Sequence, residues 1–323
     1  MEENTEQRVD LTLFSEKIQE LKDRITSVIV GQEQTVDLVL TAILANGHVL
    51  IEGVPGVAKT LLARLTARLI DADFSRVQFT PDLMPSDVLG TTVFNMKTNG
   101  FDFHQGPIFA DIVLVDEINR APAKTQAALF EVMEERQISI DGTTHRMGDL
   151  YTILATQNPV EQEGTYKLPE AQLDRFLMKI TMDYPSLEEE VNILERHHTN
   201  AALVKLDDIV PAITKEELLS LRAFMNQVFV DRTLLQYIAL IVQQTRTSKA
   251  VYLGASPRAS VAMLQSSKAY ALLQGRDFVT PEDIKFVAPY VLQHRLILTA
   301  EAEMEGYSPV KVTQRLIDKV EVP

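Results

Sequence analysis

The feature that most constrains this chain is a glycine-bearing loop between a short apolar segment and a helical one. Residues 48–52 read HVLIE, the loop reads GVPGVAKT, and LLARLTARLI follows. Glycines let backbone N–H groups turn inward onto a polyphosphate, and the N-terminus of the following helix adds a favourable field. The pattern therefore predicts a phosphate-binding P-loop. Its expected residues are Gly53, Val54, Pro55, Gly56, Val57, Ala58, Lys59, Thr60 and Leu61.

Two side chains of this loop have distinct expected roles. Lys59 would neutralise charge on the β- and γ-phosphates, and Thr60 would offer its hydroxyl to Mg²⁺. Ala58 departs from the usual pattern, which has glycine at this position. Because alanine is small enough for the first turn of a helix, we expect the departure to be mild. A tight turn with no ligand is the alternative interpretation, and the strand before and helix after argue against it.

Two further apolar segments are followed by polar side chains. The run IVLV at residues 112–115 leads to Asp116 and Glu117, and unpaired charge near a core is costly. In a P-loop enzyme the first acid orders Mg²⁺, and the second polarises the water that attacks the γ-phosphate. The strand expected at residues 151–155 leads to Asn158, whose neutral amide is suited to hold that water or a phosphate oxygen.

The order of the expected elements predicts an α/β fold. Short apolar runs alternate with helical segments up to about residue 185, which is typical of a parallel sheet. After Tyr184-Pro185 the segments are helical, with no strand expected between them. A length of 323 residues suits about two domains. We therefore expect an α/β core over residues 1–185 and an all-α domain over residues 186–323.

Two β-hairpins are expected within the core, at residues 91–106 and 137–146. Asn99-Gly100 marks the turn of the first, and Asp141-Gly142 marks the turn of the second. Both are insertions into the alternating pattern of strands and helices.

Charge and composition restrict the partners and the compartment. The 31 Lys and Arg against 45 Asp and Glu give a net charge of −14, which makes nucleic acid an unlikely partner. Cysteine is absent, as suits a reducing compartment. No segment has the roughly 18 apolar residues that span a bilayer, and the acidic N-terminus does not resemble a secretory signal. We therefore expect a cytoplasmic protein without a membrane segment.

The ordered series of motifs resembles the MoxR family of AAA+ ATPases over nearly the whole chain. The resemblance lies in GVPGVAKT, LVDEINRAPAKTQAALFEVMEER, ATQNPVEQEGTYKLPEAQLDRF and LGASPRA, with VIVGQE and QFTPDLMPSDVLG before and between them. It implies an AAA+ P-loop NTPase core, in which helices sandwich a parallel sheet, and an all-α C-terminal lid domain. It also implies ATP bound between the subunits of a ring, usually a hexamer.

The resemblance assigns roles at the carboxyl ends of the strands. Lys59 and Thr60 resemble the Walker A residues, and Thr60 and Asp116 would hold Mg²⁺. Glu117 resembles the second Walker B acid, and Asn158 resembles the polar sensor 1 residue. Arg120 is assigned no catalytic role, because it either faces a subunit interface or pairs with an acid such as Glu117.

Two arginines complete the set that the resemblance implies. Arg175 in LDRF resembles the arginine finger that reaches into a neighbouring subunit's site, and Arg258 in GASPRA resembles the sensor 2 arginine, on the lid, that touches the γ-phosphate. A guanidinium suits both roles because it stays charged and offers forked donors. The alternatives are an ordinary ion pair of Arg175 with Asp174 or Glu170, and a surface charge at Arg258.

The function that the resemblance implies is Mg²⁺-dependent ATP hydrolysis, coupled to chaperone-like maturation or assembly of partner proteins. The family's partners often carry von Willebrand factor A domains. Phe94, Phe101 and Phe103 of the first hairpin either grip a client or pack against the core. The alternatives are the ATPase subunit of a metal-chelatase-like or DNA-acting AAA+ machine, and a non-hydrolysing nucleotide-dependent scaffold.

Overall fold

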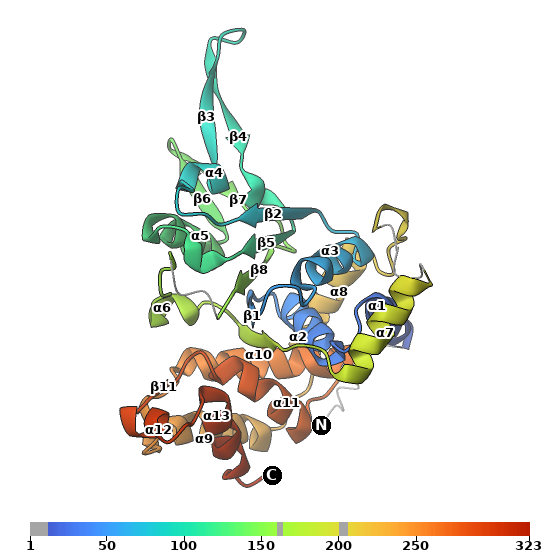
Figure 1. Cartoon of the computed structure of the whole chain (residues 1–323), viewed down its shortest axis with the longest axis vertical. Coiled ribbons are helices and arrows are strands. Elements are labelled where there is room, and N and C mark those ends of the chain that lie inside the picture. The colour runs from blue at the N-terminus through green and yellow to red at the C-terminus, as the bar shows by residue number, and fades with distance from the viewer. Residues whose placement is uncertain (1–11, 160–163, 200–205) are drawn as a thin grey trace, which may run out of the picture.

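A five-stranded parallel sheet forms the centre of the core in the computed structural model, which describes residues 12–159, 164–199 and 206–323 (Figure 1). All four neighbouring pairs of strands run parallel, which confirms the predicted sheet. In spatial order the strands are β2 (Phe74–Gln78), β5 (Ile112–Asp116), β8 (Thr152–Gln157), β1 (Val49–Gly53) and β9 (Met178–Met182).

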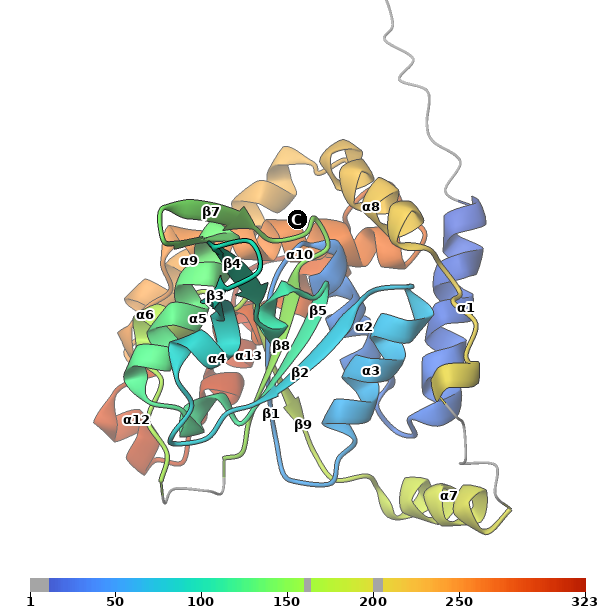
Figure 2. The same cartoon turned by 90° about the horizontal axis from the view of Figure 1, so that it is seen from above.

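Helices cover both faces of this sheet, because side chains of successive strand residues point to opposite faces. Val49 and Ile51 of β1 belong to one apolar cluster, and Leu50 between them belongs to another. Figure 2 shows the helices of the first cluster on one side of the sheet and those of the second on the other. The first are α1 (Thr12–Val28), α2 (Glu33–Leu44) and α3 (Lys59–Leu69), and the second are α4 (Pro85–Leu89) and α5 (Ala123–Glu135).

Both predicted hairpins are present. The first pairs β3 (Gly90–Asn95) with β4 (Gly100–Gln105), and it projects far from the body of the core (Figure 1). The second pairs β6 (Gln137–Ile140) with β7 (Thr143–Arg146).

The three phenylalanines of the first hairpin divide between the two expected roles. Phe94 and Phe101 contact each other near the tip, with ring centroids 5.2 Å apart, and are 46% and 74% exposed. Phe103 packs against the core near the base of the hairpin, where its ring lies 4.3 Å from that of His145 in the second hairpin. The base is therefore anchored, and the tip presents apolar surface to solvent.

The chain after residue 186 is mainly helical, as predicted. Ser186 and Thr280, each directly before a helix, both form capping boxes. The expectation that no strand occurs here is wrong at one place, because β10 (Val251–Leu253) pairs with β11 (Ile297–Leu298). Three and two residues are too few to show an alternating pattern. Helix α6 (Glu170–Leu173) precedes this region. The helices of the region are α7 (Leu187–His198), α8 (Lys215–Phe224), α9 (Arg232–Thr247), α10 (Pro257–Leu273), α11 (Pro281–Leu292), α12 (Ala300–Met304) and α13 (Pro309–Asp318).

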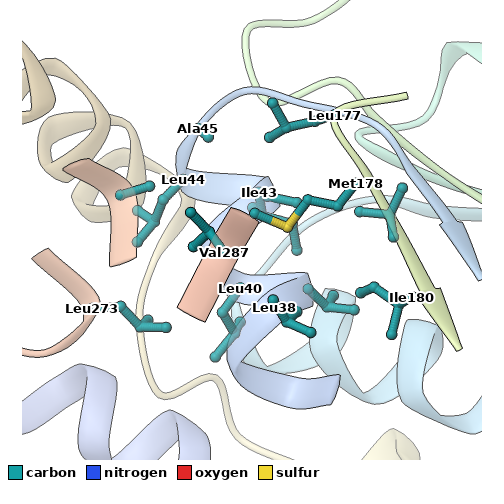
Figure 3. Packing of buried hydrophobic residues seen from close by; sticks show 14 of the residues in the cluster. Leu38, Leu40, Ile43, Leu44, Ala45, Leu177, Met178, Ile180, Leu273 and Val287 are labelled. Carbon is teal, nitrogen blue, oxygen red and sulfur yellow. The ribbon is translucent and has the colours of Figure 1, made fainter. Parts of the chain in front are cut away.

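The helices of this region pack directly on the core. Figure 3 shows Val287 of α11 close to Ile43 of α2 and Met178 of β9, with Leu273 of α10 farther away in the same buried apolar cluster. Helix α8 is also tied to the core, because Arg222 donates to the carbonyl oxygen of Ile43 at 2.6 Å.

The domain boundary between residues 185 and 186 stays a prediction. In the described part of the chain, no helix combines the length and apolarity needed to cross a bilayer.

A buried histidine before β1 makes stability depend on pH. His48 Nδ1 accepts a hydrogen bond from the Ile153 backbone at 2.9 Å, and Nε2 lies 3.1 Å from the carbonyl oxygen of Met133. Burial, together with the nearby Arg136 guanidinium, lowers the pKa of His48 to about 3. The unfolded chain has a histidine pKa of about 6.5. Between these two pKa values the unfolded chain therefore binds more protons at His48 than the native protein does. The free energy of unfolding consequently falls as the pH falls through this range.

We expect His48 to account for a loss of about 2 kcal/mol in the free energy of unfolding between pH 7 and pH 5. Urea unfolding of His48→Gln and of the wild type at both pH values measures this, because the variant lacks that part of the change. His198→Gln is the control, since His198 is exposed and keeps similar surroundings on unfolding. Equal pH dependence of the wild type and His48→Gln would contradict the assignment.

Candidate nucleotide site

The predicted P-loop lies between the end of β1 and the start of α3. Gly56 has a φ of +91°, and a side chain there would meet nothing within 4 Å, so the mouth of the loop is open. A Cβ at Gly53 would lie 2.7 Å from the carbonyl oxygen of Met182 in β9, so only glycine fits. Lys59 Nζ donates to the Gly53 carbonyl oxygen across the loop. The lysine thus lies against the loop backbone, as the predicted phosphate-binding role requires.

Ala58 does not have the helical conformation expected of it. Its φ of +63° and ψ of +21° place it in the left-handed region, and α3 begins one residue later. The loop geometry that turns N–H groups inward requires this conformation, which glycine adopts freely. For alanine it costs roughly 1–2 kcal/mol. The departure from the usual pattern is therefore tolerated at the expense of stability.

Asp116 has the partners that a nearly buried acid needs. Arg76 Nε lies 2.6 Å from Oδ2, and the Thr156 hydroxyl donates to Oδ1 at 3.1 Å. The same hydroxyl oxygen accepts a hydrogen bond from the Glu117 backbone N–H at 3.0 Å. Thr156 therefore ties the two acids at the end of β5 to strand β8. Neither Arg76 nor Thr156 was identified from the sequence. Arg76 lies outside the quoted motifs, whereas Thr156 lies within the ATQN segment, two residues before Asn158.

Glu117 lies at a sharp turn with its carboxylate held from two sides. Its φ is +56°, which turns the chain immediately after β5. Gln78 Nε2 donates to Oε2 at 2.8 Å, and Arg120 Nε lies 3.1 Å from the same oxygen. Arg120 thus forms the ion pair that was one of its two expected roles. Gln78 was missed by sequence analysis, although its position at the end of a strand beside the acids is the signal that marks it.

Strand register brings most of the predicted site residues to one edge of the sheet. Gln78 pairs with Asp116 across β2 and β5, and Glu52 pairs with Gln157 across β1 and β8. Asn158 follows Gln157 directly and is buried. In a parallel sheet all carboxyl ends lie at the same edge, where ligands of α/β proteins bind. The P-loop, both acids and Asn158 therefore meet there.

The donors at this edge fit Mg²⁺. Thr60 offers a hydroxyl oxygen and Asp116 offers a carboxylate, and Mg²⁺ prefers such oxygen ligands. Within the described residues, no three histidine or acidic side chains gather around a common point.

The two predicted arginines lie at the opposite edge of the sheet and share one acid. Arg175 Nη2 lies 2.9 Å from Oε2 of Glu134, and Arg258 Nη2 lies 3.0 Å from Oε1 of the same carboxylate. The partner of Arg175 is therefore Glu134, not Asp174 or Glu170. Glu134 belongs to α5 and was not identified from the sequence.

Both arginines line a pocket of about 530 Å³. Asn46, Gly47 and His48, which precede β1, form another part of its wall. The P-loop follows β1 at the other end of that strand. Five residues of strand, at about 3.3 Å each, separate the two places by roughly 17 Å. The structure therefore does not bring Arg175 or Arg258 to the P-loop of its own chain.

Comparison with known proteins agrees with this fold. Residues 48–178 match the model of the ATPase family associated with various cellular activities (AAA), and residues 243–318 match that of the AAA lid domain. The crystal structure of a protein from Cytophaga hutchinsonii, provisionally described as an ATPase, superposes with a TM-score of 0.89 at 40% identity, covering 97% of both chains. The fold is thus that of an AAA+ ATPase core with a lid.

Relatives in sequence identify the family more closely. The chain is 47% identical to the Bacillus subtilis protein YeaC over 301 residues, 93% of each chain. It is 44% identical to Chaperone MoxR1 of Mycobacterium tuberculosis over 308 residues, which cover 93% of this chain and 80% of the relative. Protein MoxR of Methylorubrum extorquens is 30% identical, with 91% of each covered. The chain belongs to the MoxR family of AAA+ ATPases.

The left-handed alanine of the P-loop yields a prediction about stability. We expect Ala58→Gly to raise the free energy of unfolding by about 0.5–1 kcal/mol, because glycine removes the conformational cost but adds freedom to the unfolded chain. Urea unfolding measures the difference. Ala63→Gly is the matched control, since Ala63 is buried inside α3, where glycine should destabilise by roughly 1 kcal/mol. A loss of stability in Ala58→Gly would show that the left-handed alanine is not strained.

Proposed function

We propose that this protein hydrolyses ATP with Mg²⁺ at sites shared between neighbouring copies of the chain. The observation that carries the proposal is the separation of the predicted site residues between two edges of the sheet. The P-loop, Glu117 and Asn158 lie at one edge, and Arg175 and Arg258 lie at the other. We call the edge with Arg175 and Arg258 the arginine edge, and the other the P-loop edge. A second copy would complete the site if its arginine edge faced the P-loop of the first.

Each residue at the P-loop edge has a chemical role in this proposal. The P-loop amides and Lys59 bind the phosphates, and Thr60 and Asp116 hold Mg²⁺, which neutralises phosphate charge. Glu117 polarises the attacking water and accepts its proton, while the Asn158 amide orients that water. Attack breaks the bond between the β–γ bridging oxygen and the γ-phosphorus, so that ADP and phosphate leave.

The arginine edge stabilises the charge that develops during this step. Arg175 and Arg258 would leave Glu134 for the γ-phosphate oxygens of the neighbouring copy. An arginine supplied in this way is worth about 10³–10⁵ in turnover in related phosphoryl transfer. The two guanidiniums already lie side by side on Glu134, so both can approach the same phosphate group.

The biological role that we propose is chaperone-like maturation or assembly of partner proteins by a ring, most simply a hexamer, in the cytoplasm. The similarity to a relative named Chaperone MoxR1 supports it. The exposed Phe94 and Phe101 at the hairpin tip are suited to contact an unfolded or partly folded client, and proteins with von Willebrand factor A domains are the proposed partners. Stimulation of turnover by such a protein, compared with stimulation by DNA, tests this choice.

The shared site is tested by mixing two inactive variants. Arg175→Ala should lower turnover at least about 10³-fold while ATP binding persists, and Lys59→Ala should abolish binding at its own P-loop. In an equal mixture, about a quarter of the interfaces combine an intact P-loop with an intact Arg175, so we expect ATPase activity to reappear. The control is a double variant, Lys59→Ala with Arg175→Ala. Mixed with Arg175→Ala, it should restore no ATPase activity. Normal turnover by Arg175→Ala alone would overturn the shared site.

Removing the acid that polarises water should separate binding from hydrolysis. We expect Glu117→Gln to bind ATP and to hydrolyse it at least about 100-fold more slowly, so that an ATP-bound assembly accumulates. Particle mass in solution with ATP and with ADP, together with phosphate release, measures this. Glu131→Gln, an exposed acid on α5 outside the site, should behave as the wild type. A Glu117→Gln monomer that hydrolyses ATP rapidly would exclude both the proposed role of Glu117 and the assembly.

A further inference from the structure

A segment of the lid region holds the loop that carries Arg175. Immediately after α11, Gln293 donates from Nε2 to a backbone carbonyl oxygen of β9 at 2.5 Å. The next residue, His294, is buried and places Nε2 3.0 Å from the carbonyl oxygen of Phe176. Arg295 then makes the largest set of contacts. All three residues lie in the region that matches the AAA lid domain, and all three contact the segment that enters β9.

The Arg295 guanidinium is almost fully enclosed, with its side chain 4% exposed. Nε lies 2.6 Å from Oδ1 of Asp174, and Nη2 donates to the carbonyl oxygens of Asp174 at 3.1 Å and Phe176 at 2.7 Å. Nη1 donates to the carbonyl oxygens of Leu177 at 3.1 Å and of Val291 in α11. These five bonds match the five N–H donors that a guanidinium has. A lysine, with three donors on a single nitrogen, cannot reproduce them.

Arg175 lies within the segment that Arg295 holds. Its neighbours Asp174 and Phe176 both accept hydrogen bonds from Arg295 through their backbone. The Arg175 side chain extends to Glu134, where it meets Arg258 from the first turn of α10. The lid region therefore makes two contacts around Arg175, one with the backbone of the residues on either side of it and one with its counterion Glu134.

We infer that Arg295 is a positioning residue for Arg175, which joins the lid to the arginine that serves the neighbouring copy. The inference rests on the proposed function, because it requires Arg175 to act in another copy's site. Arg295 fixes the direction in which Arg175 leaves the backbone. A movement of the lid consequently moves Arg175, and this links the position of the lid in one copy to hydrolysis in the next.

The test uses Arg295→Lys in the full chain. We expect kcat to fall about 10–100-fold, as a displacement of the order of 1 Å does in catalysis. Affinity for a fluorescent ATP analogue should stay within about twofold, because the P-loop edge is unchanged. Arg276→Lys is the matched control: Arg276 pairs with Asp283 and the Phe278 backbone, inside the lid region. It should leave kcat within about twofold of the wild type.

Mixed assemblies distinguish positioning from a general loss of structure. Arg295→Lys subunits keep an intact P-loop, so Lys59→Ala subunits, which keep Arg175 correctly held, should restore their turnover. Lys59→Ala subunits that also carry Arg175→Ala should not. Arg295→Lys should cause no further loss of kcat in an Arg175→Ala background. Absence of recovery, or a further loss in that background, would overturn the inference.

Two outcomes separate this inference from the function on which it rests. Normal turnover of Arg175→Ala overturns the shared site, and the inference with it. Loss of turnover in Arg175→Ala, but wild-type kcat in Arg295→Lys, overturns the inference alone.

If Arg295→Lys does not fold, Asp174→Asn replaces it, because this change removes the carboxylate partner of Arg295 and leaves the lid sequence intact. A loss of kcat that Lys59→Ala subunits restore supports the inference, and wild-type kcat overturns it.

Discussion

The pairing of β1 with β8 on one side and β9 on the other is the constraint on which both halves of the nucleotide site depend. The P-loop leaves the carboxyl end of β1, and the residues that wall the arginine pocket precede its amino end. A strand that is bonded on both sides and buried on both faces cannot shorten. The sheet itself therefore fixes the distance between the two edges.

Within one copy, charges of the candidate site are paired with opposite charges at each edge. Asp116 is paired with Arg76, Glu117 with Arg120, and Arg175 and Arg258 share Glu134. Such pairs hold side chains near their working positions before any ligand arrives, which is the condition for efficient electrostatic stabilisation. They also mean that binding exchanges one set of ionic partners for another, so that little buried charge is left uncompensated.

Much of the site could be predicted from the sequence because its residues lie in or just after short, strongly patterned strands. The P-loop, Asp116, Glu117 and Asn158 are of this kind. Gln78, Glu134 and Arg295 are not, since each finds its partner far along the chain, at separations of 39, 124 and 121 residues. Strand β2 has one buried residue of five, so its apolar pattern is weak. The left-handed Ala58 is set by the loop, against the preference of the residue.

The ribbon of β3 and β4 is attached to the core through two glycines at its base. A Cβ at Gly90 would lie 2.3 Å from the His104 carbonyl oxygen, and one at Gly106 would lie 2.2 Å from that of Val88. Towards the tip, by contrast, Phe94 and Phe101 pack chiefly on each other. Substitutions near the tip of this ribbon therefore leave the close contacts at its base unchanged. The tip can vary in sequence independently of the core that holds the candidate nucleotide site.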